Sequence, residues 1–344
     1  MNFFLIVSVL ILLFLITFFC QIFTNAVENF GKYFKIDDGA LGSIFAAFGT
    51  ALPETILPLI AVFGAYISGS EITLGKDIGR GAVLGSPFLL STLAFFIVGI
   101  TIIIMSALKK REDIICIDIN YYKRDLKFFF IAYTIGVLSA FIPFSAIKIA
   151  IGCFLLLFYI YYAIRTVKKY SNNGEECENE GEPLYFSKIF KSEKYYIIVL
   201  FLQFFISIIG LVISAHYFVE ELKELSVLLG ISAMIISLFL APVATELPET
   251  FNGILWSIKK KDVLAVSNIT GAMVFQACIP MSIGIFFTDW SFSNEAVVNV
   301  CSVYFALLIL FLGTLKSKCF SAKIFLFSLI PYVLFVIYSF FNMK

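Results

Sequence analysis

The chain is a succession of long apolar segments separated by short polar stretches, and this pattern leaves few folds open to it. Of its 344 residues, 60% are hydrophobic and 14% are charged, so most of the chain cannot be placed in water. A bilayer core needs about 20 apolar residues per helix, and on that measure we predict an all-α membrane protein with ten transmembrane helices. The predicted helices lie near residues 3–24, 41–68, 82–107, 128–146, 149–165, 195–215, 226–256, 262–288, 296–313 and 324–341.

Basic residues predict the orientation of these helices. If the N-terminus lies outside, 20 of the 25 Lys and Arg residues fall in cytoplasmic loops, as is typical of membrane proteins. The exceptions are Lys76, Arg80, Lys148, Lys223 and Lys344. The ten-helix count and the charge bias support each other, because one helix more or fewer would scramble the bias. We therefore expect an integral protein of the plasma membrane with both termini outside.

One long polar stretch, residues 168–193, divides the chain into residues 1–167 and 194–344. Each part holds five predicted helices, so the second part enters the membrane from the opposite side, and related halves are then inverted repeats. The stretch contains several glutamates, but their spacing does not match a calcium-binding EF-hand loop. We expect a solvated cytoplasmic linker, with calcium sensing as the weaker alternative.

The tetrapeptide Leu-Pro-Glu-Thr occurs twice, at residues 52–55 and 247–250, each time in the middle of a long apolar segment. Glu54 and Glu249 are therefore carboxylates at membrane depth, where charge is costly and usually functional. A single Pro-Glu pair is also compatible with a helix kink and a hydrogen-bonded carboxylate. Two matched copies in inverted halves favour one ion site shared by both halves.

Each motif also offers neutral oxygens. Proline has no amide hydrogen, so the carbonyl four residues before it loses its helical donor, and a threonine four residues before each glutamate shares its helical face. These predicted ligands belong to Gly49, Thr50, Ala244 and Thr245. Ca²⁺ takes six to eight such oxygens in irregular geometry. The sole histidine, His216, and the seven scattered cysteines form no metal pattern with the motifs, which argues against zinc or copper.

The segments around both motifs resemble a known family. Residues 48–54 and 243–249 look like the two Gly-Thr-Ser-Leu-Pro-Glu repeats of the calcium/cation antiporter superfamily, the sodium/calcium exchanger group. The motif regions 49–55 with 83–86, and 243–250 with 267–276, carry the resemblance, which extends over essentially the whole chain. It implies that Glu54 and Glu249 ligate calcium, that Thr50 and Thr245 lie beside them, and that Ser86 helps to bind sodium.

This chain also departs from the family pattern. Ala51 and Glu246 stand where the motifs have serines, and Ala272 replaces a further serine; Leu90 and Gln276 stand at two later polar positions. The losses remove oxygens that sodium sites in the family use, so proton coupling is the alternative to sodium coupling.

Glu246 lies three residues before Glu249, near the same helical face. It either adds a third carboxylate to the site or turns aside to pair with a lysine or a backbone amide. Asn268 and Gln276 lie eight residues apart on one stripe of their helix. They either face the same cavity or hydrogen-bond between packed helices.

We predict a secondary antiporter that exchanges Ca²⁺ against Na⁺, with H⁺/Ca²⁺ (or other divalent cation) exchange as the alternative and a cation channel as a weaker one. The sequence shows no phosphate-binding loop and no catalytic constellation, so we expect neither an enzyme nor a cofactor. The expected partners are small cations and the lipid bilayer, with no nucleic acid and no obligatory protein partner.

Overall fold

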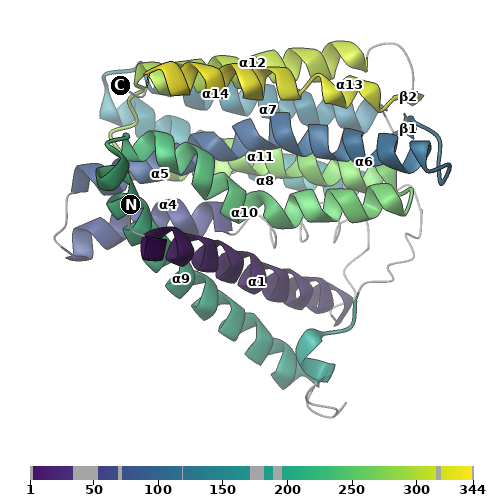
Figure 1. Ribbon diagram of the computed structural model, residues 1–344, viewed down its shortest axis with the longest axis horizontal. Coiled ribbons are helices and arrows are strands. Elements are labelled where there is room, and N and C mark those ends of the chain that lie inside the picture. The colour runs from purple at the N-terminus through teal and green to yellow at the C-terminus, as the bar shows by residue number, and fades with distance from the viewer. Residues whose placement is uncertain are drawn as a thin grey trace.

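The computed structural model describes residues 3–33, 53–68, 72–117, 119–170, 182–188, 196–314 and 319–342. These residues form a bundle of long helices that run along the longest axis of the molecule (Figure 1). Both termini lie at one end of the bundle, and a small two-stranded ribbon lies at the other. The helices are α1 (Phe3–Tyr33), α4 (Pro53–Ser68), α5 (Ile72–Leu89), α6 (Phe95–Ala107), α7 (Ile119–Ser139), α8 (Ser145–Tyr170), α9 (Tyr196–Leu229), α10 (Ala233–Ile258), α11 (Asp262–Phe287), α12 (Asn294–Gly313), α13 (Lys323–Leu326) and α14 (Leu329–Asn342).

Each of the ten predicted spans overlaps a helix of the structure. Seven stretches of helix in the described chain are long and apolar enough to cross a membrane, which makes this an integral membrane protein. The other three spans correspond to α4, described only from Pro53, to α7, which begins in polar sequence, and to α10, whose apolar part ends before its glutamates. The ten-span count and the inverted relation of the halves stay predictions.

The all-helical expectation needs one correction. Strands β1 (Ile114–Cys116) and β2 (Cys319–Ser321) pair antiparallel, with Ile115 opposite Phe320. A disulfide joins Cys116 to Cys319 across this ribbon, over a sequence separation of 203 residues. Sequence analysis assigned no pairing to the cysteines, because nothing in their spacing brings two positions so far apart together.

The predicted helix at 82–107 begins ten residues earlier, at Ile72. It continues through a π-helical turn, η2 (Leu90–Ala94), into α6 without a break. The Ser328 hydroxyl, in the turn between α13 and α14, donates to the Thr92 carbonyl at 2.7 Å and so satisfies a backbone group of the π-helical turn. A π-helical turn in a long helix is often found near a functional site.

Helices α5 and α10 cross with their backbones in close contact at the centre of the bundle. A Cβ atom on Gly85 would overlap the Leu238 carbonyl oxygen, and one on Gly81 would crowd the Met234 carbonyl oxygen. Two glycines four residues apart are a common way for membrane helices to approach closely. This crossing places Ser86, the next residue of α5, against the part of α10 that carries the second Leu-Pro-Glu motif.

Helices α1 and α9 pair with each other at an angle to the rest of the bundle (Figure 1). Residues 182–188 pack against this pair: Leu184 is buried, and the amide of Tyr185 donates to Asn25 Oδ1 at 3.0 Å. The amide of Phe186 donates to Gln203 Oε1 at 2.9 Å. The polar stretch at 168–193 is therefore not solvated throughout. Its first residues continue helix α8 to Tyr170, and residues 182–188 pack against α1 and α9. The acidic run at 175–180 lies outside the described residues.

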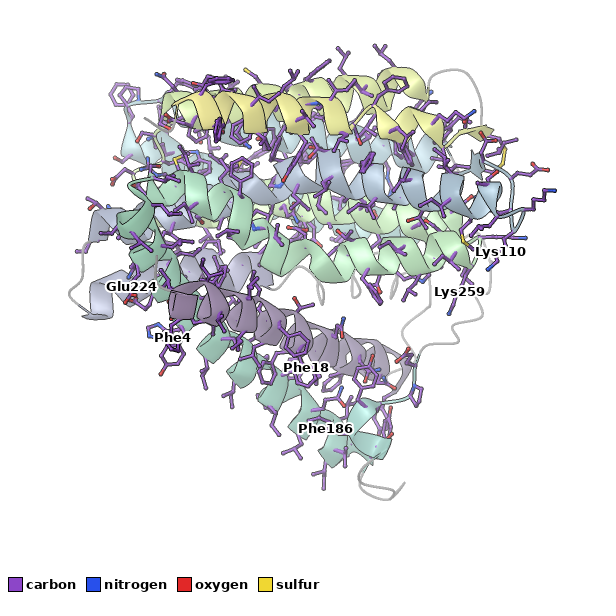
Figure 2. The ribbon with its side chains drawn as sticks, viewed as in Figure 1. Phe4, Phe18, Lys110, Phe186, Glu224 and Lys259 are labelled. Carbon is purple, nitrogen blue, oxygen red and sulfur yellow. A yellow bond between two sulfur atoms is a disulfide. The ribbon has the colours of Figure 1, made fainter. Side chains whose placement is uncertain are left out.

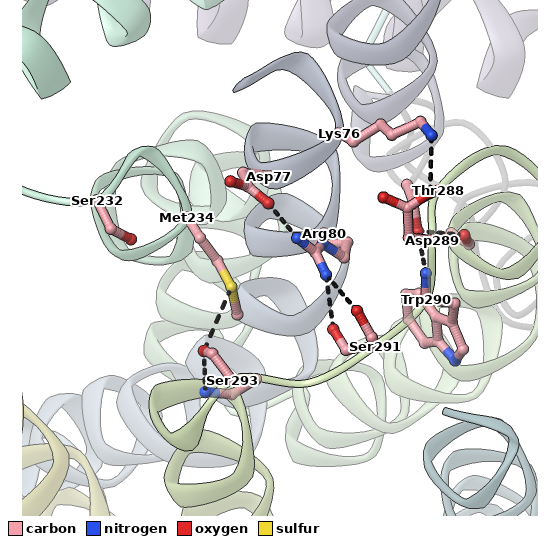
Figure 3. A network of polar contacts seen from close by, with 12 residues as sticks. Lys76, Asp77, Arg80, Ser232, Met234, Thr288, Asp289, Trp290, Ser291 and Ser293 are labelled. Carbon is pink, nitrogen blue, oxygen red and sulfur yellow. Dashed lines mark hydrogen bonds and ion pairs between the residues drawn. The ribbon is translucent and has the colours of Figure 1, made fainter. Parts of the chain in front are cut away.

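At the end that holds both termini, α5 is tied to the connection between α11 and α12 (Figure 3). Lys76 forms a 2.7 Å ion pair with Asp289, and the hydrogen bond from Lys76 lowers the pKa of that carboxyl below its ordinary value. Arg80 pairs with Asp77 and donates to the Ser291 carbonyl at 2.7 Å. These partners explain why the polar start of α5 is helical although its composition resembles a loop.

Candidate cation site

Three glutamates meet in the interior of the bundle. One carboxylate oxygen from each of Glu54, Glu246 and Glu249 lies within 4.8 Å of the other two, and all three residues are at most 2% exposed. Calcium–oxygen distances are about 2.4 Å, so ligand atoms on opposite sides of one Ca²⁺ are about 4.8 Å apart. One ion can therefore contact all three carboxylates, which come from α4 in the first predicted half and α10 in the second.

Helix α10 presents a run of ligands because of its sequence spacing. Glu246 and Glu249 are three residues apart, and Thr245 precedes Glu249 by four, so the three side chains share one face. Thr245 is 2% exposed, and its hydroxyl has no hydrogen-bond partner among the described residues. Ala244 lies in the same helix one turn before Pro248, whose missing amide hydrogen leaves the Ala244 carbonyl without its usual donor.

The structure decides between the two orientations that the sequence left open for Glu246. The amide of Gln276, on α11, donates to Glu246 Oε1 at 2.7 Å, and Ser86, on α5, lies close to this carboxylate. No ion pair in the described part of the chain includes Glu246. Glu246 therefore joins the cluster and does not turn aside to a lysine. Sequence reasoning named Glu246 and Gln276 separately but not their contact.

The remaining predicted ligands are placed differently. Asn268 is buried on α11, and neither its amide nitrogen nor its oxygen has a partner among the described residues. It lies eight residues before Gln276, which is about 12 Å along a helix, and no hydrogen bond among the described residues joins it to the glutamates, so its role as a ligand stays a prediction. Gly49 and Thr50 lie outside the described residues, and their roles stay predictions.

Several oxygens at this site are buried without hydrogen-bond donors in the part of the chain that the structure describes. They are Oε1 and Oε2 of Glu54, Oε2 of Glu246, Oε1 of Gln276 and Oγ1 of Thr245. Burying such groups without partners is unfavourable, most of all for carboxylates. A hard cation bound by the three carboxylates would offset the largest of these costs, and an oxygen-only ligand set suits Ca²⁺ better than zinc or copper.

The arrangement agrees with comparisons to known proteins. The family model described as sodium/calcium exchanger protein matches residues 4–168 and 199–342. The chain belongs to the sodium/calcium exchanger protein family. Membership in this family of membrane exchangers confirms the resemblance seen in the sequence and the expectation of a transporter instead of an enzyme.

Individual relatives of this exchanger-family chain are distant but cover most of it. An uncharacterized membrane protein, MJ0091, of Methanocaldococcus jannaschii is 24% identical over 301 residues, 86% of this chain and 85% of the relative. The fold is similar to the crystal structure of the H⁺/Ca²⁺ exchanger CAX, with a TM-score of 0.74 at 16% identity over 98% of this chain and 86% of that one. It is also similar to the sodium-calcium exchanger NCX_Mj, with a TM-score of 0.61 at 21% identity over 98% and 99%.

Proposed function

We propose that this exchanger-family protein moves Ca²⁺ across the membrane in exchange for a monovalent cation, and that Glu54, Glu246 and Glu249 bind both ions in turn. The observation that carries the proposal is the cluster itself: three buried carboxylates from α4 and α10 approach one another closely enough to share one ion. Proteins of similar fold include exchangers of calcium for protons and of calcium for sodium.

The charge of the cluster explains why exchange is favoured over a leak. Carboxylates in a poorly solvated site are costly when nothing neutralises them. When the site is empty, the free-energy barrier to switching its exposure from one side of the membrane to the other is therefore large. A bound cation lowers that barrier, so the site returns with a counter-ion and the two fluxes are coupled.

Sodium is the first candidate for the counter-ion. Sodium binds where neutral oxygens supplement carboxylates, and Ser86 and Thr245 place hydroxyls beside the cluster. The Ala244 carbonyl adds a further neutral oxygen on α10. Family membership points in the same direction.

The proton is a second candidate because one observation favours it. Glu246 brings a third carboxylate to the cluster, and Gln276 holds it there. Three like charges in a poorly solvated pocket repel one another, and a proton relieves that repulsion as well as a sodium ion does.

The experiment is calcium flux into proteoliposomes with the sodium and pH gradients varied separately. Sodium coupling predicts calcium movement driven by a sodium gradient at fixed pH, whereas uptake that follows the pH gradient and ignores sodium assigns the proton. Flux should saturate and require a counter-ion on the opposite side. Large single-channel currents in planar bilayers would instead identify a channel and remove the antiport proposal.

A further inference from the structure

Two basic turns meet at the end of the bundle opposite the termini. One follows α6 and contains Lys109 and Lys110; the other follows α10 and contains residues 259–261, all lysines. Figure 2 shows Lys110 and Lys259 at this end, pointing away from the bundle. A depression of about 550 Å³ lies here, lined by Lys109, Lys110, Arg111, Glu112, Ile114 and Lys260. We call the five lysines and Arg111 the basic cradle.

The cradle is a built feature and not two independent loops. Arg111 forms a two-pronged ion pair with Asp262, at 2.8 and 2.7 Å, and donates to the Ser257 carbonyl at 2.6 Å. Its side chain is only 5% exposed. This bidentate contact locks the turn after α6 onto the turn after α10. The lysines of the two turns are therefore held in a fixed position relative to one another.

The five lysines of the cradle differ from the basic residues at the other end of the molecule. All five are exposed, and none takes part in an ion pair among the described residues. At the opposite end, Lys76 and Arg80 are paired as Figure 3 shows, Lys223 pairs with Glu220, and Lys148 donates to the Trp290 carbonyl at 3.1 Å. In contrast to these residues, the five cradle lysines gather exposed positive charge that no ion pair neutralises in the described part of the chain.

Apolar side chains border the cradle on the bundle side. Ile104 and Leu108, from the last turn of α6 and the residue after it, are 51% and 59% exposed; Leu255 and Ile258 of α10 are 39% and 42% exposed. On a membrane protein such surfaces face acyl chains. The lysines that follow them along the chain therefore lie at the depth of lipid head groups.

We propose that the basic cradle binds the phosphate of an anionic phospholipid, with the acyl chains along the exposed flanks of α6 and α10. The charges select a negative head group, and the adjoining apolar flanks select a lipid over a soluble phosphate ester. The same two helices lead to the cation site, since α6 continues η2 and α5, which carries Ser86, and α10 carries Glu246 and Glu249. A bound lipid thus bridges two site-bearing helices.

The test uses the full-length protein in neutral detergent with dioleoyl phosphatidylglycerol as the probe and dioleoyl phosphatidylcholine as the uncharged comparison. Native mass spectrometry counts retained lipids, and thermal unfolding follows their effect on stability. Lys110→Gln with Lys260→Gln removes two charges that line the depression while leaving the Arg111–Asp262 contact in place. Lys127→Gln with Arg165→Gln removes two exposed charges from α7 and α8 at the same end and serves as the matched control.

We expect the wild-type protein and the control variant to retain phosphatidylglycerol in preference to phosphatidylcholine, and the cradle variant to bind it at least about tenfold more weakly. Free glycerol 3-phosphate should neither stabilise the protein nor displace the lipid. Equal binding of both lipids by the wild type, or equal loss in the control variant, would overturn the proposal. Stabilisation by glycerol phosphate alone would show that the cradle takes a soluble anion. If the cradle variant does not fold, Lys109→Gln with Lys259→Gln makes the same comparison.

Discussion

The two predicted halves contribute unequally to the cation site. At two matching motif positions the second half has Glu246 and Gln276, which hydrogen-bond to each other at 2.7 Å. The first half has Ala51 and Leu90 at those positions, and Leu90 is fully buried in apolar surroundings. Both positions are polar in one half and both are apolar in the other.

The hydrogen bond indicates that the residues at these two positions depend on each other. A buried carboxylate needs a donor, and a buried amide needs a partner, so Glu246 without Gln276, or Gln276 without Glu246, leaves an unsatisfied group. Glu54 and Glu249 come from the motif that both halves share. The comparison therefore separates a common pair of ligands from an added pair that belongs to the second half alone.

The largest effect should come from the shared ligands. Glu54→Gln and Glu249→Gln should each slow calcium exchange by about 100-fold or more, because either change removes a charge that faces the cation in a desolvated site. Flux into liposomes measures this, with size-exclusion chromatography to verify folding. Glu224→Gln, which neutralises an exposed carboxylate on α9, is the control and should retain wild-type flux. A wild-type rate in either site variant would remove that glutamate from the site.

Loss of the added carboxylate should have a smaller effect. Glu246→Gln should weaken the apparent calcium affinity roughly tenfold, because ligand charge tunes calcium binding and Glu246 has one oxygen already engaged by Gln276. Glu246→Ser restores a hydroxyl at the motif position, and we expect it to preserve or strengthen the dependence of flux on sodium. If flux in the serine variant instead loses its sodium dependence, Glu246 itself binds the sodium ion.

Removing the amide partner should act mainly on stability. Gln276→Leu leaves Glu246 Oε1 without its donor in a buried site, which should lower the free energy of unfolding by about 1–3 kcal/mol. Leu90→Met, at the matching position of the first half, conserves volume and should cost less than about 1.5 kcal/mol. Thermal unfolding of both variants in the same detergent compares them. Equal destabilisation would show that the hydrogen bond to Glu246 contributes nothing specific.

The smallest effect is expected at the serine that accompanies the cluster. Ser86→Ala removes one neutral hydroxyl beside Glu246, a polar interaction worth about 1 kcal/mol, so the apparent calcium affinity should fall only a few-fold. The matching residue of the second half is already alanine, and Ala272→Ser provides the reciprocal variant. Dose–response curves for calcium flux compare the Ser86→Ala and Ala272→Ser variants. A loss of flux in Ser86→Ala as large as that in Glu54→Gln would make Ser86 a principal ligand.

Local sequence patterns predict much of the site, whereas contacts between residues far apart in the sequence cannot be predicted from such patterns. The Leu-Pro-Glu repeat identified Glu54, Glu249 and Thr245 because helical spacing fixes which residues share a face. The bond between Glu246 and Gln276 joins two helices, and no local rule specifies it. The sequence alone predicts the start of α5 too late, because the charges of Lys76 and Arg80 are typical of a loop and their partners, Asp289 and Ser291, are distant in sequence. The disulfide between Cys116 and Cys319 had no sequence signal at all.

The central claim is that α4 and α10 build one cation site between them, and calcium-binding stoichiometry tests it most directly. Isothermal titration or equilibrium dialysis with radioactive calcium should be performed on the purified wild type, Glu54→Gln, Glu249→Gln and the double variant. The account predicts one high-affinity calcium per wild-type chain, its loss in either single variant, and no further loss in the double variant. Two calcium ions per wild-type chain, with one retained in each single variant, would show two separate sites and contradict the account.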